Sequence, residues 1–275
     1  MLERRQNPIG RAVTARVPRI TLGGLRLAVL DIEQTANFMI EMAFPHRRVG
    51  RPLYLTSANG EVLARCSTEP VTDQLFRTAD LINADGQPLV TVSRLKSRTP
   101  LPERVATTDL FHVVARKAAA AGLTFYMFGA DESENAQAVA NVQRMYPDLQ
   151  IVGHCHGYLR GMALRAKVDE INRLAPDYLW VALGVPYEQA FVDEFAPMLS
   201  NVGIIKTAGG LFNFLSGSRP RAPLWMQDVG LEWVWRIWLE PRRLFWRYFT
   251  TNPRALYLLF NKSRSSGAGR KRRRA

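Results

Sequence analysis

Short apolar runs alternate with longer amphipathic stretches along most of this chain, and polar or glycine-containing turns separate them. Strands that alternate with helices of about ten or more residues are typical of a parallel sheet with helices on both faces. The pattern therefore predicts an α/β fold with a mostly parallel, Rossmann-like sheet. The runs expected in the sheet are Leu53–Leu55, Leu75–Ile82, Thr124–Phe128, Leu149–Val152, Tyr178–Leu183 and Gly203–Lys206, and Thr21–Asp31 is expected to form a hairpin or an edge strand. The expected helices are Ile32–Met42, one beginning within Gly60–Arg65, one ending near Leu95, Leu110–Ala121, Glu132–Tyr146, Arg165–Leu174 and Glu188–Phe195.

The same pattern divides the chain into four parts. Residues 1–20 are basic, contain two prolines and are expected to form a flexible arm, and residues 21–216 are expected to form an α/β catalytic domain. Residues 217–260 are expected to form a helical appendage rich in Arg and Trp, and the Gly, Ser and Arg content of residues 261–275 predicts a disordered basic tail. No run approaches the roughly 18 apolar residues that a membrane span requires, so any membrane association is expected to be peripheral.

The appendage concentrates indole and guanidinium groups. Five of the six tryptophans lie in it, interleaved with arginines. An indole is stable where hydrocarbon meets water, and a guanidinium binds phosphate through two parallel hydrogen bonds. The prediction is therefore a C-terminal helical membrane-binding appendage, and the alternative is an ordinary amphipathic helix packed on the core. A helix over 230–239 would align Glu232, Arg236 and Glu240 on one face, and Pro241 would mark a break or begin a second helix.

Charge is distributed unevenly along the chain. From Arg219 to the end, 14 Lys and Arg residues stand against 3 Asp and Glu, so this stretch carries +11 of the net +13. This asymmetry predicts an anionic partner at one end, and phospholipid, a diphosphate ligand and nucleic acid all qualify. Cys66 and Cys155 form no CxxC pair, and the N-terminus carries no apolar signal segment. We therefore expect a reducing, cytoplasmic setting, with neither a disulfide framework nor a zinc site.

Candidate chemistry lies in the turns that follow the predicted strands, because ligands of parallel sheets bind at the carboxyl ends of strands. Asp85 is either a general base that takes a proton from an attacking hydroxyl or the cap of the next helix. Thr56 and Ser57 are either hydrogen-bond donors to a ligand or turn hydroxyls. Arg104 either holds phosphate or forms an ion pair.

Other turn motifs exclude some classes of site. Gly129 and the pair Gly209-Gly210 lack the GxGxxG and GxxxxGK[ST] patterns, which counts against a nicotinamide enzyme or a P-loop ATPase. His154 and His156 have no evident third or fourth partner for a metal ion, so a structural or substrate-facing role is favoured.

Eight co-linear segments between about Leu22 and Tyr248 resemble the WecG/TagA/CpsF glycosyltransferases, also called the N-acetylmannosaminyltransferase family. They are LTSAN (55–59), NADG (83–86), PERVATTDL (102–110), FYMFGA (125–130), YPDLQIVGHCHGY (146–158), ALGVPYEQ (182–189), GGLFNFLSGSRPRAP (209–223) and GLEWVWRIWLEPRRL (230–244). The resemblance implies an inverting enzyme that moves a sugar from a UDP-sugar onto a polyprenyl-diphosphate-linked sugar. It also implies action at the inner face of the cell membrane, with no metal ion or other cofactor.

The resemblance implies roles for individual residues. Asp85 falls on the aspartate of the family's ADG motif and is the expected base. The motif threonine falls on Ser57, with Thr56 adjacent, so both hydroxyls stay candidates, and Asn59 falls on the motif asparagine. Arg104 falls on the arginine expected to contact the diphosphate. The other residues expected to bind substrate are Gly129, Gly184, Glu188, Gln189 and, from the docked appendage, Arg221, Arg236 and Arg243.

The chain departs from the family pattern at two segments. The usual GxPKQE reads GVPYEQ at 184–189, and the aspartate of the FDF segment is Asn213. The sugar is therefore left open among N-acetylmannosamine, its uronic acid, glucose and glucuronate. We expect a UDP-sugar donor, a lipid-diphosphate acceptor and an anionic membrane as partners, without nucleic acid; self-association is left open. The alternatives are a non-enzymatic nucleic-acid-binding protein that uses the basic tail and a soluble enzyme that modifies nucleotide sugars.

Overall fold

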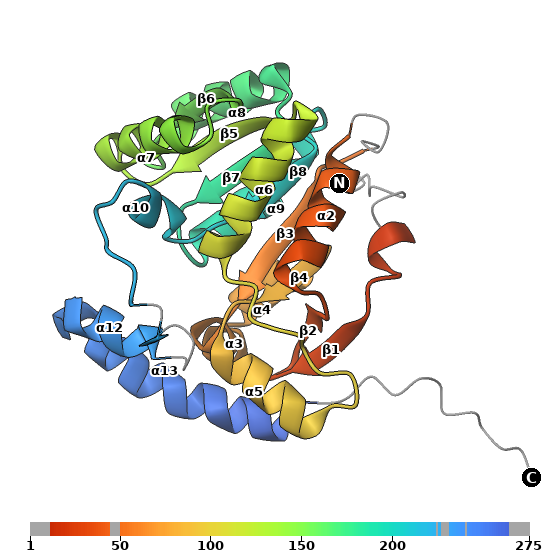
Figure 1. Ribbon diagram of the computed structural model, residues 1–275, viewed down its shortest axis with the longest axis vertical. Helices are drawn as coiled ribbons and strands as arrows, with labels where there is room; N and C mark the ends of the chain where they lie inside the picture. Colours follow the sequence, from red (N-terminus) through yellow and green to blue (C-terminus); the bar gives the residue numbers. More distant parts are fainter. Residues whose placement is uncertain (1–11, 45–49, 224, 227–230, 240, 264–275) are drawn as a thin grey trace, which may run out of the picture.

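The computed structural model describes residues 12–44, 50–223, 225–226, 231–239 and 241–263 of the 275-residue chain. Residues 1–11 of the expected arm and 264–275 of the expected tail lie outside the described residues. The described chain forms an α/β body, and two C-terminal helices run along one edge of it (Figure 1).

Six parallel strands form the central sheet, in the order β4-β3-β8-β7-β5-β6. The α/β class and the mostly parallel sheet are thus confirmed. Because every strand runs in the same direction, all six carboxyl ends lie along one edge of the sheet. The strands are β3 (Leu53–Ala58), β4 (Leu81–Ala84), β5 (Thr124–Gly129), β6 (Gln150–Cys155), β7 (Tyr178–Ala182) and β8 (Ile204–Thr207).

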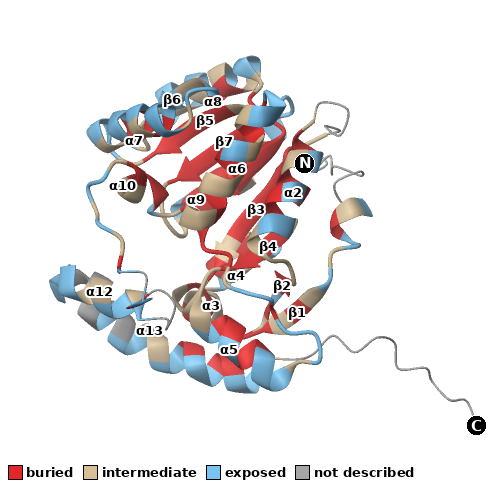
Figure 2. Cartoon of the chain, viewed as in Figure 1, coloured by how far each residue is buried: buried red, intermediate tan, exposed pale blue. Residues whose placement is uncertain are grey.

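Helices cover both faces of the sheet, as expected. The strands alternate their side chains between the two faces, which creates two separate apolar cores. One core contains Phe111, Phe125 and Trp180, and the other contains Tyr126 and Phe191. Figure 2 shows that the strands between them, apart from the edge strand β6, are almost entirely buried. The first face carries α2 (Ile32–Ala43), α6 (Thr107–Ala121), α7 (Glu132–Met145) and α10 (Leu211–Leu215), and the second carries α8 (Gly161–Leu174), α9 (Tyr187–Phe195) and the 3-10 helix η2 (Ala196–Met198).

Two elements differ from the expected pattern. Helix α4 (Pro70–Arg77) occupies the beginning of the run expected to lead straight into β4. Val71, Leu75 and Phe76 have the i, i+4, i+5 spacing of a helix, and Pro70 in the first turn is a second helix signal, so the sequence does carry the pattern of this helix. Strand β6 continues past Val152 to Cys155, because an edge strand pairs on one side only and tolerates polar, half-exposed residues.

A third apolar core joins segments that are far apart in the sequence. It contains the hairpin of β1 (Arg19–Leu22) and β2 (Leu25–Ala28), helices α3 (Gly60–Thr68) and α5 (Gln87–Lys96), and the last turns of α13 (Pro241–Asn261). The hairpin begins inside the stretch expected as an arm. Leu258 and Leu259 of α13 are 3% and 0% exposed. The end of α13 is therefore packed as part of the α/β body.

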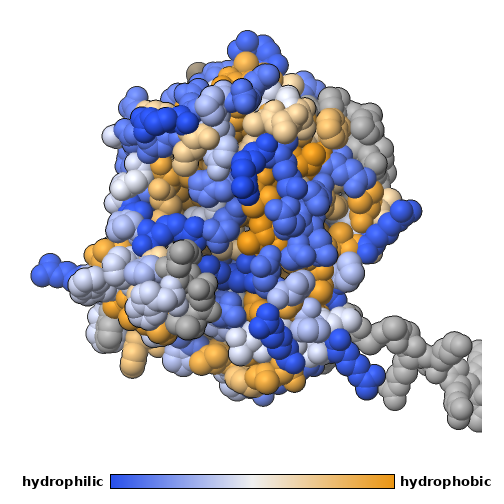
Figure 3. All heavy atoms as spheres, in the orientation of Figure 1, coloured by the Kyte–Doolittle hydropathy of each residue, from blue (hydrophilic) through white to orange (hydrophobic). Residues whose placement is uncertain are grey.

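The preceding part of the C-terminal region is exposed. Helix α12 (Glu232–Leu239) and the first turns of α13 carry Trp238, Trp246 and Phe249, whose exposed fractions are 73%, 67% and 64%. Figure 3 shows hydrophobic atoms at the surface along the lower edge of the molecule, where these helices lie in Figure 1. Among the described residues, no helix combines the length and the apolar content needed to cross a membrane.

Candidate active site

A cavity of about 1270 Å³ lies along the carboxyl ends of the strands. Its volume exceeds the roughly 300–1,000 Å³ of ordinary small-molecule pockets. Glu232 and Leu239 of α12 also line it, so the C-terminal region borders the cavity. Each strand, or the turn after it, contributes lining residues, among them Ser57, Asp85, Ala130, Gly157, Leu183 and Thr207.

Asp85 lines this cavity from the turn after β4. Its backbone N–H donates to the carbonyl oxygen of Ala58 (2.8 Å), which holds the turn against the end of β3. Its Oδ2 accepts hydrogen bonds from the backbone N (3.2 Å) and Oγ1 (3.1 Å) of Thr107, the first residue of α6. Oδ1 has no hydrogen-bond partner among the described residues. Asp85 therefore does not cap the following helix, whose cap is Gly86, and one of its oxygens is open to a ligand.

A hydrogen-bond chain extends from Asp85 into the interior. Oγ1 of Thr107 lies 3.1 Å from Oγ of Ser57, and Nζ of Lys206 donates to that Oγ at 2.8 Å. Ser57 lines the cavity, whereas Thr56 is fully buried and accepts from the hydroxyl of Thr207 at 2.7 Å. Of the two candidate hydroxyls, Ser57 is thus the one beside the cavity and in the chain to Asp85.

Lys206 is absent from the residues that the sequence singled out. It is 0% exposed, and burial lowers its pKa to about 8, against the raising effect of the Asp85 and Glu188 carboxylates. The sequence did carry a signal for this residue, because Lys206 is the last residue of a run expected to be a buried strand, and Lys is almost never fully buried without a partner. A lysine within a buried parallel strand indicates a charged or hydrogen-bonding partner nearby.

Glu188 and Gln189 lie in the first turn of α9 (Tyr187–Phe195). The Oε2 of Glu188 accepts from the backbone N of Gly209 (2.9 Å), and its Oε1 accepts from Nε2 of Gln189 (3.1 Å). Burial raises the pKa of Glu188, while those hydrogen bonds and the Lys206 charge act in the opposite direction. Glu188 lines the cavity, whereas the buried Gln189 amide also donates to Oγ1 of Thr56 at 3.4 Å. The pair thus couples α9 to the ends of β3 and β8.

Three candidates on the α/β body remain: Asn59 and Gly184, which line the cavity, and Gly129, which does not. Asn59 lines the cavity, and its side chain also caps α3 by accepting from the backbone N of Val62 (3.1 Å). Gly184 lines the cavity with φ of 77°. Gly129 is not among the lining residues. Its φ is 138°, and a Cβ there would lie 2.2 Å from the carbonyl oxygen of Ala182, so this glycine is required by the backbone.

Arg104 and Arg221 are each paired with a carboxylate. Nη1 of Arg104 donates to Oε2 of Glu232 at 2.7 Å, and both side chains are 16% exposed. Arg221 makes a two-point contact with Asp109, in which Nη2 lies 3.3 Å from Oδ2. Arg104 is also near Asp109, at 3.9 Å. The structure therefore gathers both arginines at the junction of α6 and α12.

Two further candidates lie on the C-terminal helices. Arg236 is in α12 and Arg243 is in α13, but the side chains of both lie outside the described part of the structure. In β6, Nδ1 of His154 lies 2.8 Å from Oδ1 of Asn135, whose amide also donates to backbone carbonyl oxygens of β5 and β6.

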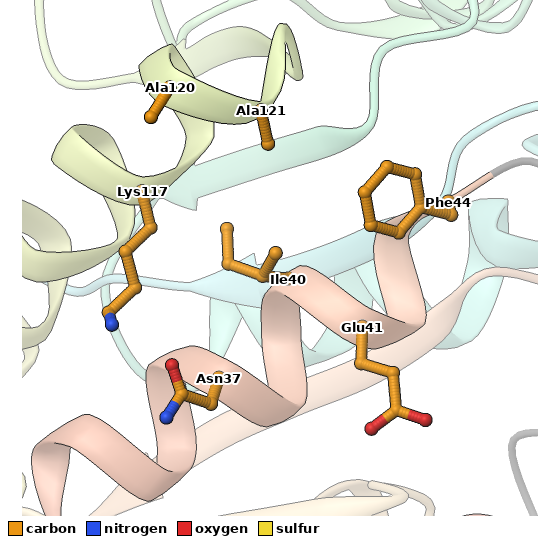
Figure 4. A pocket seen from close by; sticks show the side chains of 7 residues that line it. All are labelled: Asn37, Ile40, Glu41, Phe44, Lys117, Ala120 and Ala121. Carbon is orange, nitrogen blue, oxygen red and sulfur yellow. The ribbon is translucent and has the colours of Figure 1, made fainter.

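A second cavity, of about 570 Å³, lies between α2 and α6 (Figure 4). Its walls include Ile40 and Phe44 of α2 and Ala120 and Ala121 of α6. None of the candidate site residues lines this second cavity. Asp85 and Ser57 line the first cavity, whereas Arg104 and Arg221 are not among the residues that line either one.

The fold and the site define a class of protein: an α/β protein with a large cavity and an open carboxylate at the carboxyl edge of a parallel sheet. The profile of the Glycosyl transferase WecG/TagA/CpsF family matches residues 20–268. The chain belongs to this family and is a glycosyltransferase.

Named relatives extend over most of the chain. One is the N-acetylglucosaminyldiphosphoundecaprenol N-acetyl-beta-D-mannosaminyltransferase of Bacillus spizizenii, 29% identical over 88% of this chain and 91% of the relative. The enzyme of the same name from Bacillus subtilis is 29% identical over 73% of this chain and 76% of its own. The one from Staphylococcus aureus strain MRSA252 is 25% identical over 70% and 74%.

Proposed function

We propose that this chain is an inverting glycosyltransferase that moves a hexose-type sugar from a UDP-sugar to a polyprenyl-diphosphate-linked saccharide during surface polysaccharide synthesis. The observation that carries the proposal is the Asp85 carboxylate, which has one oxygen held by Thr107 and the other open in the large cavity. The reaction named for the relatives supports the acceptor class. N-acetylmannosamine is the first sugar to test, followed by its uronic acid, glucose and glucuronate.

In the proposed reaction Asp85 acts as the general base. It takes the proton of the acceptor hydroxyl while that oxygen attacks the anomeric carbon of the donor sugar. The bond between this carbon and the UDP oxygen breaks on the opposite face, and its electron pair leaves with UDP. A single displacement inverts the configuration and needs one base and no covalent intermediate.

Arginines are proposed to stabilise the leaving diphosphate. Arg104 and Arg221 would exchange Glu232 and Asp109 for the phosphates, because a bidentate guanidinium matches phosphate oxygens well. Arg236 and Arg243 are proposed to join them from the C-terminal helices. No metal ion is assigned to the reaction. Turnover that survives EDTA is expected, and loss of turnover that manganese restores would contradict this part of the proposal.

Helix α12 and the start of α13 are proposed to bind the anionic inner face of the cell membrane. Their exposed indoles and the charge of +11 from Arg219 onward support this. In sedimentation with phosphatidylglycerol vesicles, Trp238→Ser with Trp246→Ser should weaken binding. The matched control is Met162→Ser, which removes an 87% exposed apolar side chain from α8. Equal binding by all forms would defeat the proposal.

The decisive test is UDP release from a panel of UDP-sugars with a synthetic polyprenyl-diphosphate N-acetylglucosamine acceptor, with mass spectrometry of the product. Asp85→Asn should lower kcat by at least about 100-fold, because it removes the base. Asp148→Asn, an exposed change after α7, is the control and should keep full activity. The nucleic-acid-binding alternative predicts instead strongly salt-dependent RNA or DNA binding that is indifferent to Asp85→Asn.

A further inference from the structure

We propose that Lys206 is a positioning residue of the active site, whose ammonium group sets the direction of the hydrogen-bond chain that ends on Asp85. The inference rests on the proposed role of Asp85 as the base. Lys206 is 0% exposed and does not line the cavity, so it acts through Ser57 and Thr107 without touching substrate.

Lys206 and Asp85 are the two ends of this hydrogen-bond chain, and they determine which way the hydroxyl protons between them point. An ammonium group has donors only, and an ionised carboxylate has acceptors only. Ser57 must therefore accept from Lys206 (2.8 Å), which leaves its own proton for Thr107 (3.1 Å). Thr107 in turn has its proton for Oδ2 of Asp85 (3.1 Å). All the hydroxyl protons point toward the carboxylate.

With the protons in this order, the two carboxylate oxygens of Asp85 have different roles. Oδ2 receives both donors of Thr107, and Oδ1 is left for the acceptor hydroxyl. Without the ammonium group, Ser57 loses its obligatory donor and its hydroxyl can turn away from Thr107. Thr107 can then donate back to Ser57, and Asp85 loses a hydrogen bond and its fixed orientation. A base that is free to rotate no longer holds the geometry that proton transfer requires.

Two charged groups act on the Lys206 ammonium. They are Asp85, after β4, and Glu188, of α9. The neighbouring strands β3 and β7 place Leu55 and Trp180 beside it in register, and α2 packs against β8 as well. Among the described residues of these elements, no other carboxylate or cation contributes to its pKa. The charges of the proposed base and of the buried Glu188 carboxylate therefore both act on this ammonium group.

Kinetics with the donor and acceptor described above test the role. Lys206→Met should lower kcat at pH 7 by about 10- to 100-fold, with a much smaller change in the KM of the donor. In the wild type, kcat should fall as the pH rises through about 8, because Lys206 then loses its proton. Lys206→Arg keeps a cation that does not titrate in this range, so it should retain activity and lack that fall. Lys206→Met with the kcat and pH profile of the wild type would overturn the proposal.

A double-mutant cycle covers the case in which arginine does not fit the site. Ser57→Ala breaks the chain at its first hydroxyl and leaves the ammonium group in place. If the two residues act as one chain, Ser57→Ala and Lys206→Met together should lower kcat no further than either change alone. Fully additive losses, in variants with wild-type melting temperatures, would show independent roles and overturn the proposal.

A titration separates this proposal from the proposed function, because it needs no turnover. The chain has six lysines, so with 13Cε-labelled lysine the Lys206 signal can be assigned by its loss in Lys206→Arg. Its midpoint, expected near pH 8, should move to lower pH in Asp85→Asn, which removes a carboxylate that raises the pKa of Lys206. Asp109→Asn, the control, should leave the midpoint in place. An unchanged midpoint in Asp85→Asn would show that the two residues are not coupled, whether or not the wild type transfers sugar.

Discussion

Leu259→Ala tests whether the end of α13 is a structural part of the α/β body. The Leu259 side chain is fully buried, at 0% exposure, among residues of the hairpin, α3 and α5. Truncating a buried leucine to alanine removes its burial free energy and leaves a cavity, which together lower the free energy of unfolding by about 2–5 kcal/mol. Because alanine is the best helix former, the loss cannot come from helix propensity.

Leu256→Ala is the matched control for this change. It lies in the same helix, one turn earlier, and its side chain is 46% exposed. Its truncation should lower the free energy of unfolding by less than about 1 kcal/mol. Urea unfolding of the full chain, followed by circular dichroism, measures both variants. Equal effects of the two changes would refute the packing described for α13.

The packing also has a consequence for the site. A Cβ on Gly60, at the start of α3, would lie 3.2 Å from Cβ of Ala255 in α13, so the two helices are in close contact. The cap of α3 is Asn59, which lines the cavity. We therefore expect Leu259→Ala, but not Leu256→Ala, to weaken UDP binding as well.

Three further outcomes follow from the geometry. Glu232→Gln removes the carboxylate that competes for Arg104, so UDP should bind several-fold more tightly in calorimetry, by about 1 kcal/mol; weaker binding would contradict this. Gly129→Ala would place a Cβ 2.2 Å from a carbonyl oxygen and should lower the free energy of unfolding by about 3 kcal/mol or more in urea. Because the pKa of Lys206 drops from 10.5 in the unfolded chain to about 8 on folding, the unfolded state binds more protons between these values. The free energy of unfolding of the wild type, minus that of Lys206→Met, should therefore rise across this pH range by up to about 3 kcal/mol. If this difference does not change with pH, the linkage is refuted.

Local patterns predicted most of the fold. The apolar runs and amphipathic stretches located each strand of the sheet, because side-chain periodicity depends only on near neighbours in the chain. The prediction was wrong at α4, because the run expected as a strand includes Leu75 and Phe76 of this helix, and at β6, whose length depends on its pairing with β5. Asp85 was singled out for its place in a strand-end turn, and it does line the cavity; its role as base stays a proposal.

The sequence by itself determined the α/β class, the family and the turn that carries Asp85, because these depend on short-range periodicity and on co-linear motifs. Only the tertiary structure decided that Ser57, Thr107 and Lys206 form one chain to that carboxylate. Those residues meet because β3 pairs with both β4 and β8 and because α6 begins beside them, and strand order is a long-range property of the fold. For the same reason, only the structure showed that the last turns of α13 share a core with the N-terminal hairpin.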